Sequence, residues 1–387
     1  MKTIREDLRS FQKNDWLIMI MVTSIFLPHL VFILTNVVIL SYLLLKGELW
    51  PYIRRQVGKK WVYGFLLLEA IVCVVYRNLL GFGVTAGFFL LMVSVGYYSQ
   101  VIHPKLFHYI TEWVLICSVP MIILGLIQFR YVSQLGGYSF WEFKIQNSPS
   151  RRITGTFQNA NLFALMCEYV LATCLYCFLK NKQFLHRVWY VCIALANFGI
   201  ILLTGCRAAL VPLIFVIPIL LYFAKEKKLM VVYAAALAAV LGAVVTHPTL
   251  IPRFNDFSTI ESRFKIWRAG IRMFKRYPLF GNGPWTYHRN YLAFHAHKAV
   301  HCHNIYLDAL VSFGIIGCAF FAYYILYIFK IVRRTLSADR LLFGFMVGML
   351  VIVGVHGLVD GTLYPIKDDL YLLFILYSGF MYRKQSA

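Results

Sequence analysis

Long apolar segments, separated by short polar ones, follow one another along the whole chain. Segments of roughly 17 to 25 apolar residues are long enough to cross a ~30 Å hydrocarbon core as helices. We predict twelve membrane-spanning segments, at residues 16–28, 30–45, 61–77, 84–100, 109–128, 160–179, 188–204, 208–223, 229–246, 304–329, 341–359 and 369–382. Pro28 and His29 interrupt the first apolar run, which is too long for one bilayer crossing, so we expect a tight hairpin turn there.

This pattern predicts an all-α integral membrane protein, because backbone groups in lipid find hydrogen-bond partners only within a helix. The composition agrees, since 60% of the residues are hydrophobic and only 14% are charged. We find no internal repeat and no low-complexity linker, so residues 1–387 are interpreted as one polytopic domain. The polar first fifteen residues precede no recognisable cleavage site, and we expect no removable signal peptide.

Positive charge orients the predicted helices. With a cytoplasmic N-terminus, the short inner segments hold 22 of the 38 Lys and Arg residues, as the positive-inside rule requires. An even number of spans then places both termini in the cytoplasm. Residues 129–159 and 247–303 become two larger extracytoplasmic loops.

The other 16 cations fall on the outer side, and 11 of them are arginine. Arginine is suited to bidentate contacts with phosphate, so this bias favours an external anionic ligand. The net charge of +22 does not point to nucleic acid, because no soluble domain presents a basic face. We therefore expect the lipid bilayer and anionic substrates as partners, and no nucleic acid.

The larger outer loop contains an amphipathic segment, ESRFKIWRAGIRMFKRYPLFGNG, at residues 261–283. Its apolar positions Phe264, Trp267, Ile271 and Phe274 have helical spacing, and its basic positions Arg268, Arg272 and Arg276 lie on another face. A helix of this kind is expected to lie along the outer membrane surface. It either rests on anionic lipid heads or contributes to a ligand site.

Two further outer segments resemble cradles for an anion. RRITGTFQNANLFA, at residues 151–164, places Arg152, Asn159 and Asn161 just before a predicted span, where free backbone amides favour negative charge. TGCRAAL, at residues 204–210, places Arg207 in a tight turn between two spans. Each segment taken alone is also compatible with a structural capping role, but their common side of the membrane favours a shared site.

Four histidines crowd the segment HAHKAVHCHNIYLDAL, at residues 295–310. The spacing of His295, His297, His301 and His303 is compatible with zinc, but zinc sites usually need a fixed scaffold and often a cysteine or carboxylate. We favour His303, at the top of a predicted span and followed by Asn304, as a neutral base beside the membrane. No metal and no cofactor are predicted.

Acidic residues leave two questions open. His356 and Asp360 are four residues apart and are expected on one face of a helix, either as an imidazole with its orienting carboxylate or as a packed polar pair. Glu69, Glu112 and Glu168 fall within or near predicted spans, where carboxylates are functional candidates. These carboxylates keep a polysaccharide transporter or flippase as an alternative from another class.

Four motifs together resemble the O-antigen ligase and polymerase superfamily of bacterial membrane glycosyltransferases. They are the GTFQNAN turn (155–161), the TGCRAAL turn, the helix containing Ser262, Arg263 and Trp267 with Pro278, Gly281 and Gly283 after it, and HNIYLDALVSFGIIG with Gly314 and Gly317. They occur in the superfamily's order over residues 151–317. Cys206 and Ser312 stand where serine and an acidic residue are common, which leaves the branch of the superfamily open.

The resemblance implies a GT-C-like membrane glycosyltransferase bundle of about twelve transmembrane helices in the bacterial inner membrane. It implies a donor glycan on undecaprenyl diphosphate and a metal-independent, inverting transfer to a sugar hydroxyl. In this resemblance His303 matches the base, and Arg207 and Arg263 match the pyrophosphate arginines. We assign substrate binding to Arg152, Asn159, Asn161, Arg268, Arg272, Asn304, His356 and Asp360.

Within the superfamily we favour a polymerase that joins repeat units into capsule, exopolysaccharide or O-antigen. An O-antigen ligase or a protein O-oligosaccharyltransferase is the alternative. Donor and acceptor lipid-linked glycans are the expected partners, and chain-length regulators and flippases are further candidates.

Overall fold

A computed structural model describes residues 9–146, 148–248, 258–362 and 364–385 of the chain. Within these residues the regular structure is entirely helical, as the hydropathy pattern predicts. The first half contains α2 (Lys13–Ile25), α3 (His29–Leu45), α4 (Leu49–Arg55), α5 (Lys59–Val75), α6 (Leu79–Val101), α7 (Pro104–Leu135), the short helices η1 (Phe140–Glu142) and η2 (Pro149–Arg151), and α8 (Ala160–Lys180).

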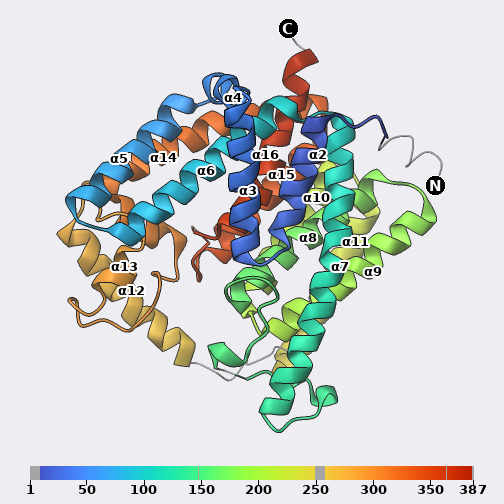
Figure 1. Cartoon of the computed structure of the whole chain (residues 1–387). Coiled ribbons are helices and arrows are strands. Elements are labelled where there is room, and N and C mark those ends of the chain that lie inside the picture. Colours follow the sequence, from blue (N-terminus) through green and yellow to red (C-terminus); the bar gives the residue numbers. More distant parts are fainter. Residues whose placement is uncertain (1–8, 147, 249–257, 363, 386–387) are drawn as a thin grey trace.

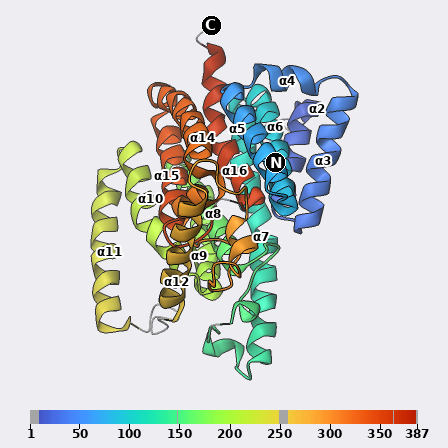
Figure 2. The same ribbon diagram turned by 90° about the vertical axis from the view of Figure 1, so that its left-hand side faces the viewer.

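The second half contains α9 (Phe184–Thr204), η3 (Arg207–Ala209), α10 (Leu210–Phe223), α11 (Lys227–Thr246), α12 (Ser258–Arg276), α13 (Thr286–Asn290), α14 (Ile305–Ala338), α15 (Arg340–His356), α16 (Ile366–Tyr377) and η5 (Ser378–Gln385). Residues 249–257 of the predicted loop 247–303 lie outside the described residues. Figures 1 and 2 show α16 and η5 towards one end of the bundle, and α12 with the segment after α7 towards the other.

Six described helices are long and apolar enough to cross a membrane, and seven if the bent pair α3 and α4 forms one span. The chain is therefore a multi-pass membrane protein. Each of the twelve predicted apolar segments contains a helix, but several of these helices are shorter than a full crossing, such as the 13 residues of α2. The hairpin predicted at Pro28 is confirmed, because α2 ends at Ile25 and packs against α3, which begins at His29.

Helix α14 is broken at Gly314, whose φ of 62° and ψ of −172° are not helical. The break lets the backbone of α14 bind the turn that follows α12. The amide of Gly283 donates to the carbonyl of Ser312 at 2.9 Å, and the amide of Ile315 donates to the carbonyl of Pro278 at 2.9 Å. A Cβ on Gly281 would collide with the Ser312 carbonyl, so this close backbone approach requires glycine.

The GTFQNAN turn is held by three neighbouring elements. The side chain of Gln128, in α7, accepts hydrogen bonds from the amides of Thr154 and Gly155 at 3.0 and 2.8 Å. The Thr156 hydroxyl donates to the carbonyl of Phe26 at 2.9 Å. In the first turn of α16, Lys367 donates to the carbonyl of Thr156 at 3.1 Å. The turn therefore has a fixed position between α7, the α2–α3 hairpin and α16.

Helix α12 forms where the amphipathic segment predicted it, and one side of it packs against the protein. Ile266, Ala269 and Met273 are buried against the loop before α14, whereas Phe264 and Ile271 are 52% and 46% exposed. Trp267 and Phe274 also pack against this buried cluster. Gly270 lets α12 approach the start of α14, since a Cβ there would lie 3.0 Å from Leu307. The placement of this helix along the membrane surface stays a prediction.

Candidate active site

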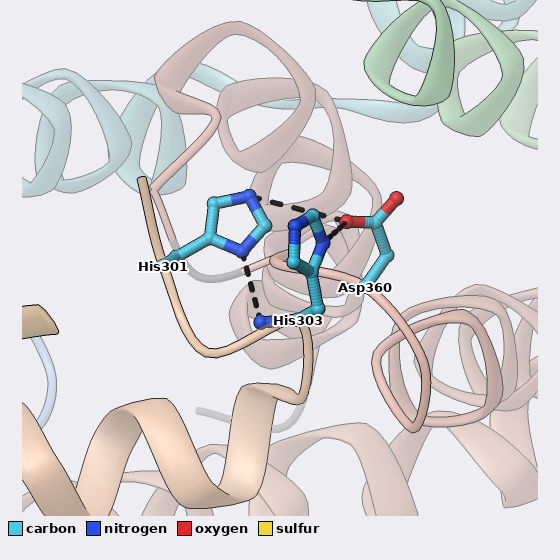
Figure 3. Close-up of side chains that lie close together, drawn as sticks. All are labelled: His301, His303 and Asp360. Carbon is cyan, nitrogen blue, oxygen red and sulfur yellow. Dashed lines mark hydrogen bonds and ion pairs between the residues drawn. The ribbon is translucent and has the colours of Figure 1, made fainter. Parts of the chain in front are cut away.

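His303 lies in the loop just before α14, and its imidazole faces the carboxylate of Asp360 (Figure 3). His303 Nδ1 is 3.0 Å from Asp360 Oδ1, and the two side chains are 28% and 5% exposed. Asp360 follows the end of α15, so the contact joins segments 57 residues apart in sequence. This geometry brings together the predicted base and a residue that we had expected to act with His356.

The hydrogen bond to Asp360 determines which nitrogen of His303 can act as a base. Burial raises the pKa of Asp360, but the hydrogen bonds from histidine and the histidine charges outweigh it and hold that pKa well below its usual range. The carboxylate can therefore only accept, so His303 Nδ1 carries the hydrogen. This tautomer leaves the lone pair of His303 Nε2 available to take a proton.

His301 packs beside His303 and has the opposite arrangement of nitrogens. Its Nδ1 accepts the backbone amide of His303 at 3.1 Å, which places the hydrogen of the neutral ring on Nε2. Burial, together with the charges of His303 and Arg263, lowers the pKa of His301 to about 4. His301 is therefore neutral at physiological pH.

His301, His303 and Asp360 are close enough to hold a metal ion, since their ligand atoms lie within 4.8 Å of one another. The hydrogen bonding opposes this use. A metal at His301 Nε2 needs the hydrogen on Nδ1, and Nδ1 already accepts the amide of His303. Metal binding would have to break that bond or rotate the ring. The arrangement is better suited to moving a proton, and independence of metal stays a prediction.

The second oxygen of Asp360 connects the base to the two predicted anion cradles. Asn161 donates to Asp360 Oδ2, and Arg152 donates to Asn161 Oδ1 at 2.8 Å. Arg152 also donates to the carbonyl of Thr204 at 2.6 Å. The loop before α8, the turn before η3 and the base are thus parts of one hydrogen-bonded network. Arg152 and Asn161, predicted to bind substrate, have structural partners in this network.

The expected placement of His356 and Asp360 on one helix was wrong, because α15 ends at His356. The two side chains still form a pair, with His356 Nε2 3.9 Å from Asp360 Oδ2. His356 Nδ1 lies closer to Glu168, in α8, at 2.6 Å, and the side chains of His356 and Glu168 are almost fully buried. Cys206 Sγ lies 4.0 Å from His356 Nε2. His356 therefore supports the wall behind Asp360 rather than facing a substrate.

The three arginines predicted to hold the pyrophosphate or its surroundings lie on η3 and α12. Arg207 begins η3, is half-buried, and directly follows Cys206, which borders the Asp360 network. Arg263 is half-buried and close enough for its charge to lower the pKa of His301. Arg268 is exposed one turn further along α12.

Helix α12 also supports the histidine loop directly. The indole of Trp267 donates to the carbonyl of His303 at 3.4 Å, and Arg272 donates to the carbonyl of Phe294 at 3.1 Å. Arg272 thus holds the loop, although we predicted it to bind substrate.

Two other predicted substrate ligands act as helix caps. The side chain of Asn159 accepts the amides of Asn161 and Leu162 at 2.9 Å each, which caps α8. The side chain of Asn304 accepts the amide of Leu307 at 2.9 Å and donates to the carbonyl of Leu358 at 2.9 Å. His295 and His297 are exposed on the loop that leads to the site.

Some residues of the site were missing from the sequence-based assignment. His301 was left without a role, and Glu168 was noted only as a carboxylate within a span. Gln128 and Lys367, which hold the GTFQNAN turn, were not singled out at all. A polar side chain within an apolar helix was the available signal for Gln128 and Glu168. The partners of these side chains, the amides of Thr154 and Gly155 for Gln128 and the imidazole of His356 for Glu168, lie far away in sequence and leave no local pattern.

These features define a multi-pass α-helical membrane protein with a histidine–aspartate site in the loops at one end of its bundle. A family model described as O-antigen ligase matches residues 191–322, about a third of the chain, and confirms the resemblance found in the motifs. The matched segment contains Arg207, Arg263 and His303, while Asp360 lies beyond it. No curated protein matches the chain.

Proposed function

We propose that this protein is a membrane glycosyltransferase that moves a glycan from undecaprenyl diphosphate to a sugar hydroxyl at the outer leaflet. One observation carries the proposal: His303 Nδ1 lies 3.0 Å from the Asp360 carboxylate. Because a carboxylate accepts, the hydrogen belongs on Nδ1, and Nε2 is left to act as the base. The match of residues 191–322 to the O-antigen ligase family supports the same chemistry. The arginines near this base favour a donor with an anionic leaving group.

In the proposed reaction His303 Nε2 accepts the proton of the acceptor hydroxyl. The hydroxyl oxygen forms a bond to the anomeric carbon on the face opposite the diphosphate, and the bond between that carbon and the phosphate oxygen breaks. The bonding electron pair leaves with undecaprenyl diphosphate, and the anomeric configuration inverts. Asp360 then stabilises the imidazolium of His303, as an orienting carboxylate does in other general-base sites.

Arg207 and Arg263 take the role of stabilising the charge that develops on the diphosphate, with Arg268 at the edge of the site. Guanidinium groups form charge-assisted, bidentate hydrogen bonds with phosphate. Loss of one such preorganised donor typically lowers turnover by ~10² to 10³. General-base help contributes ~10² to 10⁴, so the two effects are of similar size.

We further propose that the helices form a GT-C-like bundle of about twelve transmembrane segments. The protein lies in the bacterial inner membrane, and both termini lie in the cytoplasm. Basic residues gather in the segments assigned to the cytoplasm, which supports this orientation. Chain-length regulators and flippases remain candidate partners.

Within this chemistry we favour a polymerase of repeat units. An O-antigen ligase is the second candidate, because the family model that matches residues 191–322 is described as O-antigen ligase. The two differ in the acceptor. A polymerase uses a glycan that is itself lipid-linked, whereas a ligase uses lipid A core or protein. Deletion of the gene separates them, because loss of long chains with single units kept on the surface marks a polymerase.

The test is a reconstituted assay. Purified protein in nanodiscs is incubated with lipid-linked repeat units extracted from source cells that lack the gene, and products are resolved on gels. We expect glycan transfer by the wild type and by His297→Ala, a matched control in the same exposed loop. We expect loss of transfer with His303→Ala and with Arg207→Ala. Full transfer by either of these variants would refute the assigned roles.

The same preparation tests the transporter alternative. In liposomes, a flippase would move the lipid-linked glycan between leaflets without forming a glycosidic bond. Movement without bond formation by the wild type would replace the glycosyltransferase proposal.

A further inference from the structure

The backbone of His303 has a conformation that few residues adopt. Its φ is 49°, in the left-handed region, which is unfavourable for residues other than glycine. Such a conformation persists when neighbouring groups hold it in place. The conformation matters here because it sets the direction in which the imidazole leaves the chain towards Asp360.

His301 supplies the main support. Its Nδ1 accepts the amide of His303 at 3.1 Å, and the two rings pack edge to face with centroids 4.4 Å apart. The preceding amide, of Cys302, donates to Asp308 Oδ1 at 2.9 Å. Two successive backbone amides are therefore fixed by side-chain acceptors immediately before α14.

The ring of His301 is itself confined. Its side chain is only 14% exposed, and a Cβ placed on Gly361 would collide with the imidazole. Its Nε2 lies 3.9 Å from Asp360 Oδ1, too far for a hydrogen bond. Figure 3 shows the ring of His301 beside that of His303, with both near the same carboxylate.

We propose that His301 is a positioning residue, which holds the left-handed backbone of His303 so that its imidazole is directed at Asp360. This inference rests on the proposed glycosyl transfer with His303 as the base. His301 does not serve as a second base, since its Nδ1 accepts a backbone amide and its Nε2 carries the hydrogen. Its neutral state, from a pKa lowered to about 4, spares an imidazolium on His303 from repulsion.

Three substitutions at residue 301 separate the acceptor atom from the ring. His301→Asn keeps an acceptor, because an asparagine side chain readily accepts the amide two residues further on in an Asx turn. His301→Phe keeps a flat ring but has no acceptor, and His301→Ala has neither. Gly361→Ala is a fourth variant, which leaves residue 301 intact and displaces its ring.

The experiment measures kcat and KM for transfer in nanodiscs, with lipid-linked repeat units extracted from source cells that lack the gene. We expect His301→Ala and His301→Phe to lose ~10- to 100-fold in kcat with little change in KM, because small displacements of a catalytic group are costly. His301→Asn should recover to within about threefold of the wild type. Gly361→Ala should resemble His301→Ala.

Size-exclusion profiles and melting temperatures in detergent identify any variant that fails to fold, and such a variant is replaced in the comparison by Gly361→Ala. A wild-type kcat in His301→Phe would overturn the proposal, because it would show that catalysis needs a ring at residue 301 but not an acceptor for the His303 amide. An Asn variant as inactive as the Ala variant would also overturn it, in favour of direct proton transfer by His301. Activity in His303→Ala would instead refute the proposed function itself.

Discussion

The most direct perturbation of the proposed base is the replacement of Asp360 by asparagine, which preserves shape and removes charge. Asp360 Oδ1 accepts from His303 at 3.0 Å and from the Gly361 amide at 2.8 Å, while Oδ2 accepts from Asn161. An amide has one acceptor oxygen and one donor nitrogen. Asparagine therefore cannot satisfy all three donors in any orientation.

Each orientation of the new amide has a calculable cost. If its nitrogen faces His303, the Nδ1 of His303 must become the acceptor, and the hydrogen moves to Nε2. General-base help, worth ~10² to 10⁴ in rate, is then lost. If its oxygen faces His303, two amide donors oppose each other at Asn161, which costs about 1–3 kcal/mol. The imidazolium also loses a charged partner, worth about 1–2 kcal/mol or roughly tenfold in rate.

We therefore expect Asp360→Asn to lower kcat by at least ~10²-fold with a nearly unchanged KM, because the first orientation removes the base. The assay is single-turnover transfer in nanodiscs at saturating donor. Asp308→Asn is the matched control, since asparagine keeps an acceptor for the Cys302 amide at the same end of α14. An Asp360→Asn variant within threefold of the wild type would show that the carboxylate does not orient the base.

Four further predictions follow from individual contacts. Gly281→Ala should destabilise the fold by about 1–3 kcal/mol, because a Cβ there is strained and meets the Ser312 carbonyl, while Gly242→Ala, in open space on α11, should be neutral in the same fluorescence melting assay. Arg152→Lys should lower kcat, since Arg152 bonds Thr204 and Asn161 from two separate nitrogens, Nε and Nη2, and the single nitrogen of lysine cannot take both positions. Unchanged kcat in the transfer assay would count against the network. The pKa of His301 is about 4 in the folded protein and 6.5 in the unfolded chain. The free energy of unfolding should therefore be highest above pH 6.5 and fall by up to about 3 kcal/mol towards pH 4. In melting scans across this pH range, the His301→Asn variant should show a smaller fall. Chelators should leave glycan transfer unchanged. Transfer that is lost with chelator and restored by added zinc would contradict the hydrogen bond from the His303 amide to His301 Nδ1, which opposes metal binding.

Hydropathy predicted the helical segments well because apolar length is a local property that lipid imposes on each segment separately. The hairpin at Pro28 was predictable for the same reason, since the apolar run is too long for one crossing. The lengths of helices were less predictable. Helix α7 continues to Leu135 and α14 continues to Ala338, beyond their apolar segments, because polar residues there also have high helix propensity or pack against neighbours.

The glycines of the recognised motifs mark backbone contacts rather than chemistry. Gly281 and Gly314 allow two chain segments to meet closely enough for backbone hydrogen bonds. A Cβ on Gly317 would lie 2.8 Å from a carboxylate oxygen of Glu69. A sequence reveals that such positions are glycine, but the partner that excludes a side chain is set by folding. The motifs could therefore indicate the family without indicating which of their residues act.

The four-histidine segment illustrates why the contacts within the site could not be predicted, although His303 and Asp360 were both singled out. In an extended chain His301 and His303 would lie on the same side with their Cα atoms ~6.6 Å apart, and this spacing does not show which distant residue they share. The left-handed turn at His303 brings the two rings together and directs both towards Asp360. The sequence pattern singled out Asp360 as a partner of His356, but α15 ends at His356, so the spacing of four residues does not show that the carboxylate contacts His303. The pairing is instead determined by where two helix ends meet, α14 beginning and α15 ending, and the amide of Ile305 donates to the carbonyl of Gly357 at 2.7 Å to fix that meeting point. A backbone contact between the helix ends therefore places the base beside its carboxylate, and changes in this contact should alter catalysis without touching either side chain.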